Sequence, residues 1–268
     1  MRPLDLVATW PVATAAVAVV GPDGVRDDTG PMDRPLAWAS VTKVVTALAA
    51  WVAVEEGTIA LDDEAGPPGA TVRHLLAHAS GLSFDSDAVL ARPGERRIYS
   101  NRGIEVLAEV VAARAEMPFV DYVRAGVLEP LGMTATRIDG SPAKDAVGPT
   151  RDLARLATEL LRPTVVSVAT IASATAVAFP GLVGVLPGFG RQDPNDFGLG
   201  VEVRDHKAPH WMPASASPRT YGHFGQAGGF VWVDPDAEVA CVGLSDRPFG
   251  PWAAEVWPAL GEAVLARR

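Results

Sequence analysis

An unbroken apolar stretch near the start of the chain is its clearest pattern. From Val41 to Val54 nearly every position is apolar, which predicts a helix packed inside the protein rather than on its surface. Gly57 follows two glutamates and provides a stop for this helix. Two polar residues accompany the stretch: Ser40 stands where an N-cap belongs, and Lys43 follows one helical turn later on the same face.

Strand patterns lie at both ends of the chain, and helical patterns fill its middle. Residues 13–20 lead into a Gly-Pro-Asp-Gly turn, which predicts a hairpin. Early and late strands around a helical middle predict an α+β fold with one sheet assembled from both chain ends. The expected strands lie at 13–20, 25–28, 198–204, 221–233 and 238–244. The expected helices lie at 41–54, 71–82, 102–116, 118–131, 151–161, 165–178 and 252–266.

This arrangement divides the chain into two intimate parts. We expect residues 1–62 and 185–268 to form a sheet subdomain, and residues 63–184 to form a mostly helical one. Residues 182–197 read as a Gly/Pro/Asp loop, and residues 205–219 as a long polar connection in which His206 and His210 face solvent.

Composition narrows the function classes. The 268 residues are 48% hydrophobic, enough for a substantial core, and carry a net charge of −9. A nucleic-acid binder would normally present a basic face, so this class is disfavoured. The single cysteine, Cys241, lies in an apolar run and reads as core, which fits a reducing compartment. Asp5 and Pro11 interrupt the N-terminal apolar run, and no long apolar span follows. We therefore expect a cytoplasmic protein that does not cross a membrane.

The pair Ser40 and Lys43 is a candidate for chemistry. Lys43 has no acid three or four residues away, so burial would lower its pKa. A lysine with a lowered pKa can act as the base for a neighbouring serine, which is then the nucleophile. The alternative is structural: Ser40 only caps the helix, and the Lys43 side chain extends to solvent. A serine three residues before a lysine also arises by chance, so this motif alone is weak.

Other polar residues also have two interpretations. His74 and His78 are spaced i, i+4 like a metal pair, but no glutamate follows His74 and no third ligand is evident, so we predict no metal site. Tyr99 could be a half-buried ring with a satisfied hydroxyl. Asn101 could cap the helix expected to begin near residue 102.

Three motifs in order carry a family resemblance. Ser40-Val-Thr-Lys43, Tyr99-Ser-Asn101 and His223-Phe-Gly225 resemble the active-site motifs of class C β-lactamases and DD-peptidase-like serine hydrolases, the penicillin-recognising enzymes. Residues 74–82 and 93–101 resemble the same family. The resemblance implies an antiparallel sheet flanked by helices, a helical subdomain, and a site between the two.

The resemblance also implies roles for the first two motifs. Ser40 resembles the nucleophile and Lys43 its partner base. Tyr99 resembles the second proton carrier, which serves acylation and protonates the leaving group. Asn101 resembles the residue that orients the amide or ester side of the substrate. No cofactor is implied.

The third motif departs from the class C pattern. His223 stands where lysine is common, and a neutral imidazole holds a substrate carboxylate more weakly than an ammonium would. Gly225 would let the acyl group approach the edge strand, and Gln226 would supply one oxyanion N–H together with that of Ser40. We also expect His223 to produce a limb near neutrality in the pH–rate profile.

The sequence therefore predicts a β-lactamase-related serine hydrolase. It would form an acyl-enzyme through Ser40 and hydrolyse an ester, an amide or a β-lactam. Its partner would be a small acyl substrate, with no nucleic acid and no membrane, and the oligomeric state is not predicted. The alternative is a non-catalytic penicillin-binding-like protein that binds peptidoglycan fragments or a partner.

Overall fold

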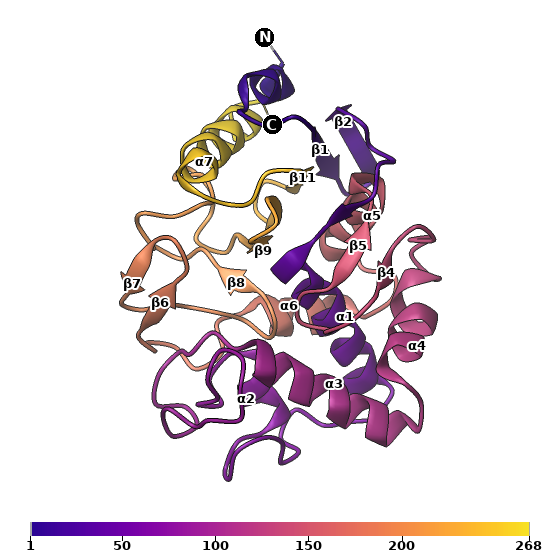
Figure 1. Ribbon diagram of the computed structural model, residues 1–268, viewed down its shortest axis with the longest axis vertical. Helices are drawn as coiled ribbons and strands as arrows, with labels where there is room; N and C mark the ends of the chain where they lie inside the picture. Colours follow the sequence, from indigo (N-terminus) through magenta and orange to yellow (C-terminus); the bar gives the residue numbers. More distant parts are fainter. Residues whose placement is uncertain (1, 268) are drawn as a thin grey trace.

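One antiparallel sheet of six strands organises the computed structural model, which describes residues 2–267 (Figure 1). Its order is β2-β1-β11-β10-β9-β8, so strands from the two ends of the chain lie side by side. β1 and β11 pair with Ala15 opposite Ser245. The predicted sheet from both chain ends is confirmed. Its strands are β1 (Ala15–Gly21), β2 (Gly24–Thr29), β8 (Glu202–Val203), β9 (Tyr221–Gly225), β10 (Gly229–Asp234) and β11 (Val239–Ser245).

Helices cover both faces of this sheet, as the sequence predicted. Because side chains alternate along a strand, Ala16 and Ala18 of β1 enter the larger core, whereas Val17 enters a second core on the opposite face. α5 (Thr150–Leu161) packs against β1, β10 and β11 on the first face. α7 (Pro251–Leu265) and the 3-10 helix η1 (Pro3–Thr9) cover the second. Burial on both faces explains why β1, β10 and β11 are apolar at nearly every position, whereas the partly exposed edge strand β2 is polar.

α1 (Thr42–Glu55) links the helical part to the sheet. It contacts α3 (Asn101–Ala115), α4 (Phe119–Val123) and α6 (Val168–Thr175), and it also contacts β9 and the 3-10 turn η2 (Ala39–Val41). Its apolar residues are buried all round, as the pattern from Val41 to Val54 predicted. The other helical elements are α2 (Val72–Leu76) and the π-helical turn η3 (Arg124–Leu128).

Short strands account for most differences from the sequence prediction. β3 (Leu36–Ala37), β5 (Ala146–Gly148) and β4 (Arg137–Ile138) form a small sheet. β6 (Gly184–Leu186) and β7 (Gly190–Gln192) form a hairpin inside the expected loop at residues 182–197. The run at 221–233 is two strands, β9 and β10, and the strand expected at 198–204 shrinks to β8. Elements of two or three residues are too short to show a period.

The division into two subdomains stays a prediction. α5 lies within the part assigned to the helical subdomain, yet it packs on the sheet. One large core includes residues of both parts. Between residues 2 and 267, no helix is both long enough and apolar enough to cross a membrane.

Candidate active site

The segment that carries Ser40 is held in a tight turn against the edge of the sheet. Ser40 lies in η2, and the preceding Ala39 has a φ of 44°, in the left-handed region that non-glycine residues rarely adopt. A Cβ added to Gly225 of β9 would lie 2.1 Å from the carbonyl oxygen of Trp38. Gly225 therefore lets β9 pack directly against the backbone of the serine turn. α1 begins at Thr42 without a side-chain cap, so Ser40 does not cap it.

Lys43 is buried and points back to the serine. Its Nζ lies 3.3 Å from Ser40 Oγ, 2.6 Å from Asn101 Oδ1 and 2.9 Å from the carbonyl oxygen of Ala143. The side chain is fully buried, so it does not extend to solvent. Burial lowers the pKa of Lys43 to about 7, against an opposing effect of the Glu105 carboxylate.

The second motif starts α3, and its cap differs from the prediction. Ser100, not Asn101, caps the helix: its Oγ accepts from the N–H of Gly103 at 2.9 Å. Asn101 is thereby the first helical residue, and its side chain turns inward. Its Oδ1 accepts from Lys43, and its Nδ2 donates to Asp85 Oδ1 at 2.9 Å.

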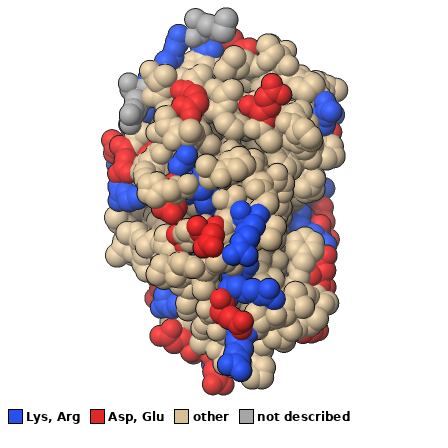
Figure 2. All heavy atoms as spheres, turned by 90° about the vertical axis from the view of Figure 1, so that its left-hand side faces the viewer, with Lys and Arg blue, Asp and Glu red and all other residues tan. Residues whose placement is uncertain are grey.

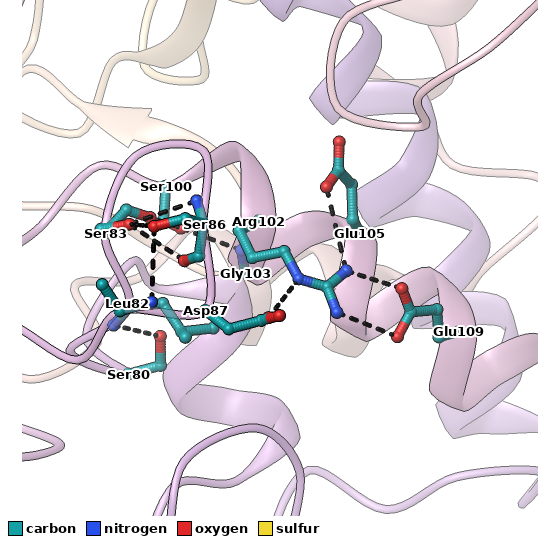
Figure 3. Close-up of polar contacts among 11 residues, drawn as sticks. Ser80, Leu82, Ser83, Ser86, Asp87, Ser100, Arg102, Gly103, Glu105 and Glu109 are labelled. Atoms are coloured by element: carbon teal, nitrogen blue, oxygen red, sulfur yellow. Dashed lines mark hydrogen bonds and ion pairs between the residues drawn. The ribbon is translucent and has the colours of Figure 1, made fainter.

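A polar network fixes the loop before α3 (Figure 3). Ser100 Oγ donates to the carbonyl oxygen of Ser83 at 2.6 Å, and the Ser83 hydroxyl contacts that of Ser86 at 2.7 Å. Arg102 then ties the loop to the helix, because its guanidinium reaches Asp87 and Glu109, each at 2.6 Å. The loop that supplies Asp85 to the site is thus anchored at both of its sides.

Tyr99 joins the second motif to the third. Its Oη lies 3.4 Å from His223 Nε2, and the Lys43 ammonium lies 4.7 Å from the centre of its ring. Nδ1 of His223 lies 2.7 Å from the carbonyl oxygen of Phe224, so Nδ1 carries the proton and Nε2 accepts from Tyr99. Burial raises the pKa of Tyr99 above its ordinary value, with the Ser40 hydroxyl acting in the opposite direction.

His223 is neutral in this setting. Burial, and then the nearby Lys43, lower the pKa of His223 to about 4. Lys43, whose pKa lies at about 7, is therefore the group that we expect to produce a limb near neutrality, in place of His223. The sequence could not show the low pKa of His223, because its causes are burial and a lysine far away along the chain.

His78 supports the second motif from behind. Its Nδ1 accepts from the N–H of Ser100 at 3.2 Å, and its ring lies 4.6 Å from that of Tyr99. His74 instead bonds the Thr71 hydroxyl at 2.9 Å. Over the described part of the chain, no three His, Cys, Asp or Glu side chains gather where they could hold a metal ion.

The motifs meet at a cavity of about 140 Å³. Ser40, Tyr99, His223 and Gln226 line it, while Lys43 and Asn101 lie behind Ser40. The Gln226 side chain turns away and donates to the carbonyl oxygen of Phe249 at 3.2 Å. The remaining lining residues are Phe84, Leu186, Pro187, Phe197, Glu202 and Phe224.

Glu202 is a buried charge at this cavity that sequence reasoning missed. Its Oε1 accepts hydrogen bonds from Lys207 Nζ at 2.8 Å and His210 Nε2 at 2.7 Å, and its Oε2 accepts one from Trp211 Nε1 at 2.8 Å. Burial alone would raise the pKa of Glu202, but Lys207 and His210 outweigh it and hold the pKa well below its ordinary range. His210 is thus buried, and the prediction that it faces solvent is wrong; His206 is exposed as predicted.

Comparison with known proteins identifies the family. The sequence model of the family described as Beta-lactamase matches residues 10–265, nearly the whole chain. The chain belongs to the β-lactamase family. This confirms the resemblance that the three motifs carried, and it makes the chain a β-lactamase-family serine hydrolase.

Solved structures and a curated protein agree with this family. The structure is similar to a crystal structure of a β-lactamase from Mycobacterium bovis, with 55% identity, 99% of each chain covered and a TM-score of 0.98. EstCE1, a hydrolase with promiscuous acyltransferase activity, shares the fold at 18% identity, with 98% of this chain and 96% of that chain covered and a TM-score of 0.80. The chain is also similar to penicillin-binding protein 4* of Bacillus subtilis, with 29% identity over 133 residues. The match covers 37% of the chain described here and only 30% of the Bacillus subtilis protein.

Proposed function

We propose that this protein hydrolyses a small acyl substrate through an acyl-enzyme formed on Ser40. The observation that carries the proposal is the contact between Lys43 Nζ and Ser40 Oγ at 3.3 Å, at a cavity that Tyr99 and His223 also line. Serine attack on a carbonyl needs a base, donors for the oxyanion and a path that returns the proton to the leaving group. The residues around this cavity offer each of these.

The hydrogen bonds of Lys43 suit a general base. An ammonium has three N–H donors, whereas a neutral amine has two donors and one lone pair. The two short contacts, to Asn101 Oδ1 at 2.6 Å and Ala143 O at 2.9 Å, can take the two donors of the amine. The lone pair then faces Ser40, and the lowered pKa of Lys43, about 7, makes the amine accessible near neutral pH. Lys43 would take the Ser40 proton during attack.

Tyr99 would return a proton to the leaving group. Its raised pKa keeps the phenol protonated, and its hydroxyl lies at the cavity between Ser40 and His223. His223 would orient this hydroxyl through its neutral Nε2 rather than bind a substrate carboxylate. Tyr99 would then recover the Ser40 proton from the Lys43 ammonium. In deacylation a water would replace the leaving group, Tyr99 with Lys43 would take its proton, and that proton would return to Ser40 as the acyl bond breaks.

The backbone would stabilise the oxyanion. We assign the two donors to the backbone N–H groups of Ser40 and Gln226, because both residues line the cavity. Gly225, the last residue of β9, keeps this strand close to the serine turn, because any side chain there would collide with the carbonyl oxygen of Trp38. Asn101 would position both Lys43 and the ester or amide side of the substrate.

The cavity favours a neutral, short acyl group. Its volume is about 140 Å³, and most of its lining is apolar. We take an ester of such a group as the first candidate substrate. β-Lactam hydrolysis, which the description of the Mycobacterium bovis relative suggests, is the second candidate. No contact at the site favours the non-catalytic alternative.

Activity profiling tests the proposal. We would assay p-nitrophenyl butyrate, a chromogenic cephalosporin and a D-amino-acid peptide with the wild type, with Ser40→Ala and with Ser215→Ala, an exposed serine that bonds Glu262 on another side of the fold. We expect turnover of the ester and a loss of at least about a thousandfold in kcat/KM in Ser40→Ala only. Equal ester turnover by wild type and Ser40→Ala would refute the proposal.

A further inference from the structure

A second hollow continues from the catalytic cavity. It has a volume of about 550 Å³, and it shares Phe84, Tyr99 and Pro187 with the cavity. Ser40 lines the catalytic cavity but not this second hollow. A substrate attacked by Ser40 and longer than the cavity can therefore continue past Tyr99 into this second hollow, which we call the outer groove.

The walls of the outer groove are exposed and apolar. Phe84 and Leu90 come from the loop before α3, and Val185 comes from β6; their exposed fractions are 51%, 54% and 63%. The two walls are tied together by a backbone bridge between Arg97 and Gly184. Large apolar side chains that stay exposed around one hollow are typical of a binding site.

Two arginines also line the outer groove, and both have donors to spare. Arg96 uses Nη2 on the carbonyl oxygen of Leu90 at 2.7 Å. Arg191 on β7 meets Asp193 at 3.3 Å in an exposed pair, and such pairs bind weakly. Within residues 2–267 these are the only hydrogen bonds of either guanidinium. Arg97, also at the groove, is buried and donates to backbone carbonyls of residues 77, 178, 179 and 195.

The catalytic cavity, at the inner end of the outer groove, has an acidic side chain in its lining where the groove has basic ones. Of the described residues that line the cavity, Glu202 alone carries a formal charge, because His223 is neutral. Its partner Lys207 lies behind it and does not reach the cavity lining. Figure 2 looks onto the side of the molecule that carries β6 and β7, where basic side chains follow one another down the lower centre with acidic ones between them. Inside the cavity, a carboxylate would meet a Glu202 already paired with Lys207 and no cationic side chain among the described lining residues, whereas outside it would meet Arg96 and Arg191.

We propose that the substrate is an ester whose acyl half is neutral and apolar and whose alcohol half ends in an anionic group. The acyl half stays bonded to Ser40 and lies in the cavity beside Glu202. The alcohol half leaves past Tyr99, crosses the apolar walls of the outer groove and places a carboxylate, sulfate or phosphate at Arg96 and Arg191. This inference rests on the proposed acyl-enzyme and adds a direction and a charge to its substrate.

A matched pair of esters tests the inference. One is the butyrate ester of 3-(4-hydroxyphenyl)propanoate, which is anionic, and the other is the butyrate ester of the corresponding amide, which is neutral. We expect kcat/KM to be about tenfold higher for the anionic ester at low salt and the preference to shrink at high salt, because screening weakens exposed charge pairs. Arg96→Gln and Arg191→Gln should each reduce the ratio, and the double variant should bring it close to one.

Arg162→Gln is the matched control. Arg162 is an exposed arginine paired with Asp23, away from the groove, so its replacement should leave the ratio unchanged. p-Nitrophenyl hemisuccinate, with its charge in the acyl half, should react more slowly than p-nitrophenyl butyrate. Equal kcat/KM for the two matched esters, or a preference that survives the double variant, would overturn the inference while Ser40-dependent turnover still supported the acyl-enzyme. Absence of any Ser40-dependent turnover would reject both.

Discussion

Burial of Lys43 makes a quantitative prediction about stability. Its pKa lies at about 7 in the folded protein, against an ordinary value of 10.5. Between these two values the unfolded chain binds more protons than the folded one, so the free energy of unfolding rises with pH. The rise is about 1.4 kcal/mol for each pH unit, and it starts gradually near the lower pKa. From pH 7 to pH 9, Lys43 should therefore add about 2 kcal/mol of stability.

Replacement by methionine isolates this effect. Lys43→Met keeps an unbranched side chain one atom shorter but cannot titrate, and it leaves the Asn101 and Ala143 oxygens without their donor. That loss costs about 1–3 kcal/mol for each buried acceptor, and it changes little with pH. Urea unfolding of both proteins at pH 7, 8 and 9 separates the two effects, because other titrating groups cancel in the difference.

The unfolding free energy of the wild type should rise relative to that of Lys43→Met as the pH rises. We expect the difference in unfolding free energy to shift by about 2 kcal/mol in favour of the wild type between pH 7 and pH 9. Equal slopes of unfolding free energy against denaturant in the two proteins would show that the comparison is sound. Parallel pH dependences, with a difference constant to within about 0.5 kcal/mol, would refute the argument that burial has moved this pKa.

Three further substitutions test the other motifs. His223→Ala should retain the limb near neutrality in the pH–rate profile, because the pKa of Lys43 is about 7 and that of His223 about 4; loss of the limb would return it to the imidazole. Tyr99→Phe should lower ester turnover by about 10²–10⁴-fold with little change in the thermal midpoint, and turnover near the wild-type rate would remove Tyr99 as the proton carrier. Gly225→Ala places a Cβ 2.1 Å from the Trp38 carbonyl oxygen, so it should cost about 1–3 kcal/mol in urea unfolding and slow acylation; unchanged stability would contradict the close packing.

The long elements of the fold could be predicted from the local pattern of apolar residues in the sequence. The apolar run of α1 and the runs of β1 and β11 have lengths that indicate their type, and the structure confirms each. The hairpin of β6 and β7 was missed because three-residue strands show no alternation. β4 and β5 form only because β3 from the start of the chain pairs with β5, which no local pattern announces.

The site divides in the same way. The three motifs were visible because their residues lie within four positions of one another, and the structure brings them to one cavity. The carbonyl of Ala143 could not be predicted, since a backbone oxygen carries no residue type and lies 100 positions from Lys43. His210 looked like a loop residue, and only the fold shows that it is buried against Glu202. Ser100 caps α3 in place of Asn101, and residue type could not decide between them because serine and asparagine are equally good caps.

Intact-protein mass spectrometry tests the central claim most directly. The wild type would be mixed with p-nitrophenyl butyrate and quenched in acid within the first turnovers, beside Ser40→Ala and Ser215→Ala. We expect the wild type and Ser215→Ala to gain the mass of one butyryl group, which peptide mapping should place on Ser40, and Ser40→Ala to gain nothing. A butyryl group of equal amount on Ser40→Ala, or one mapped to another residue of the wild type, would contradict this expectation.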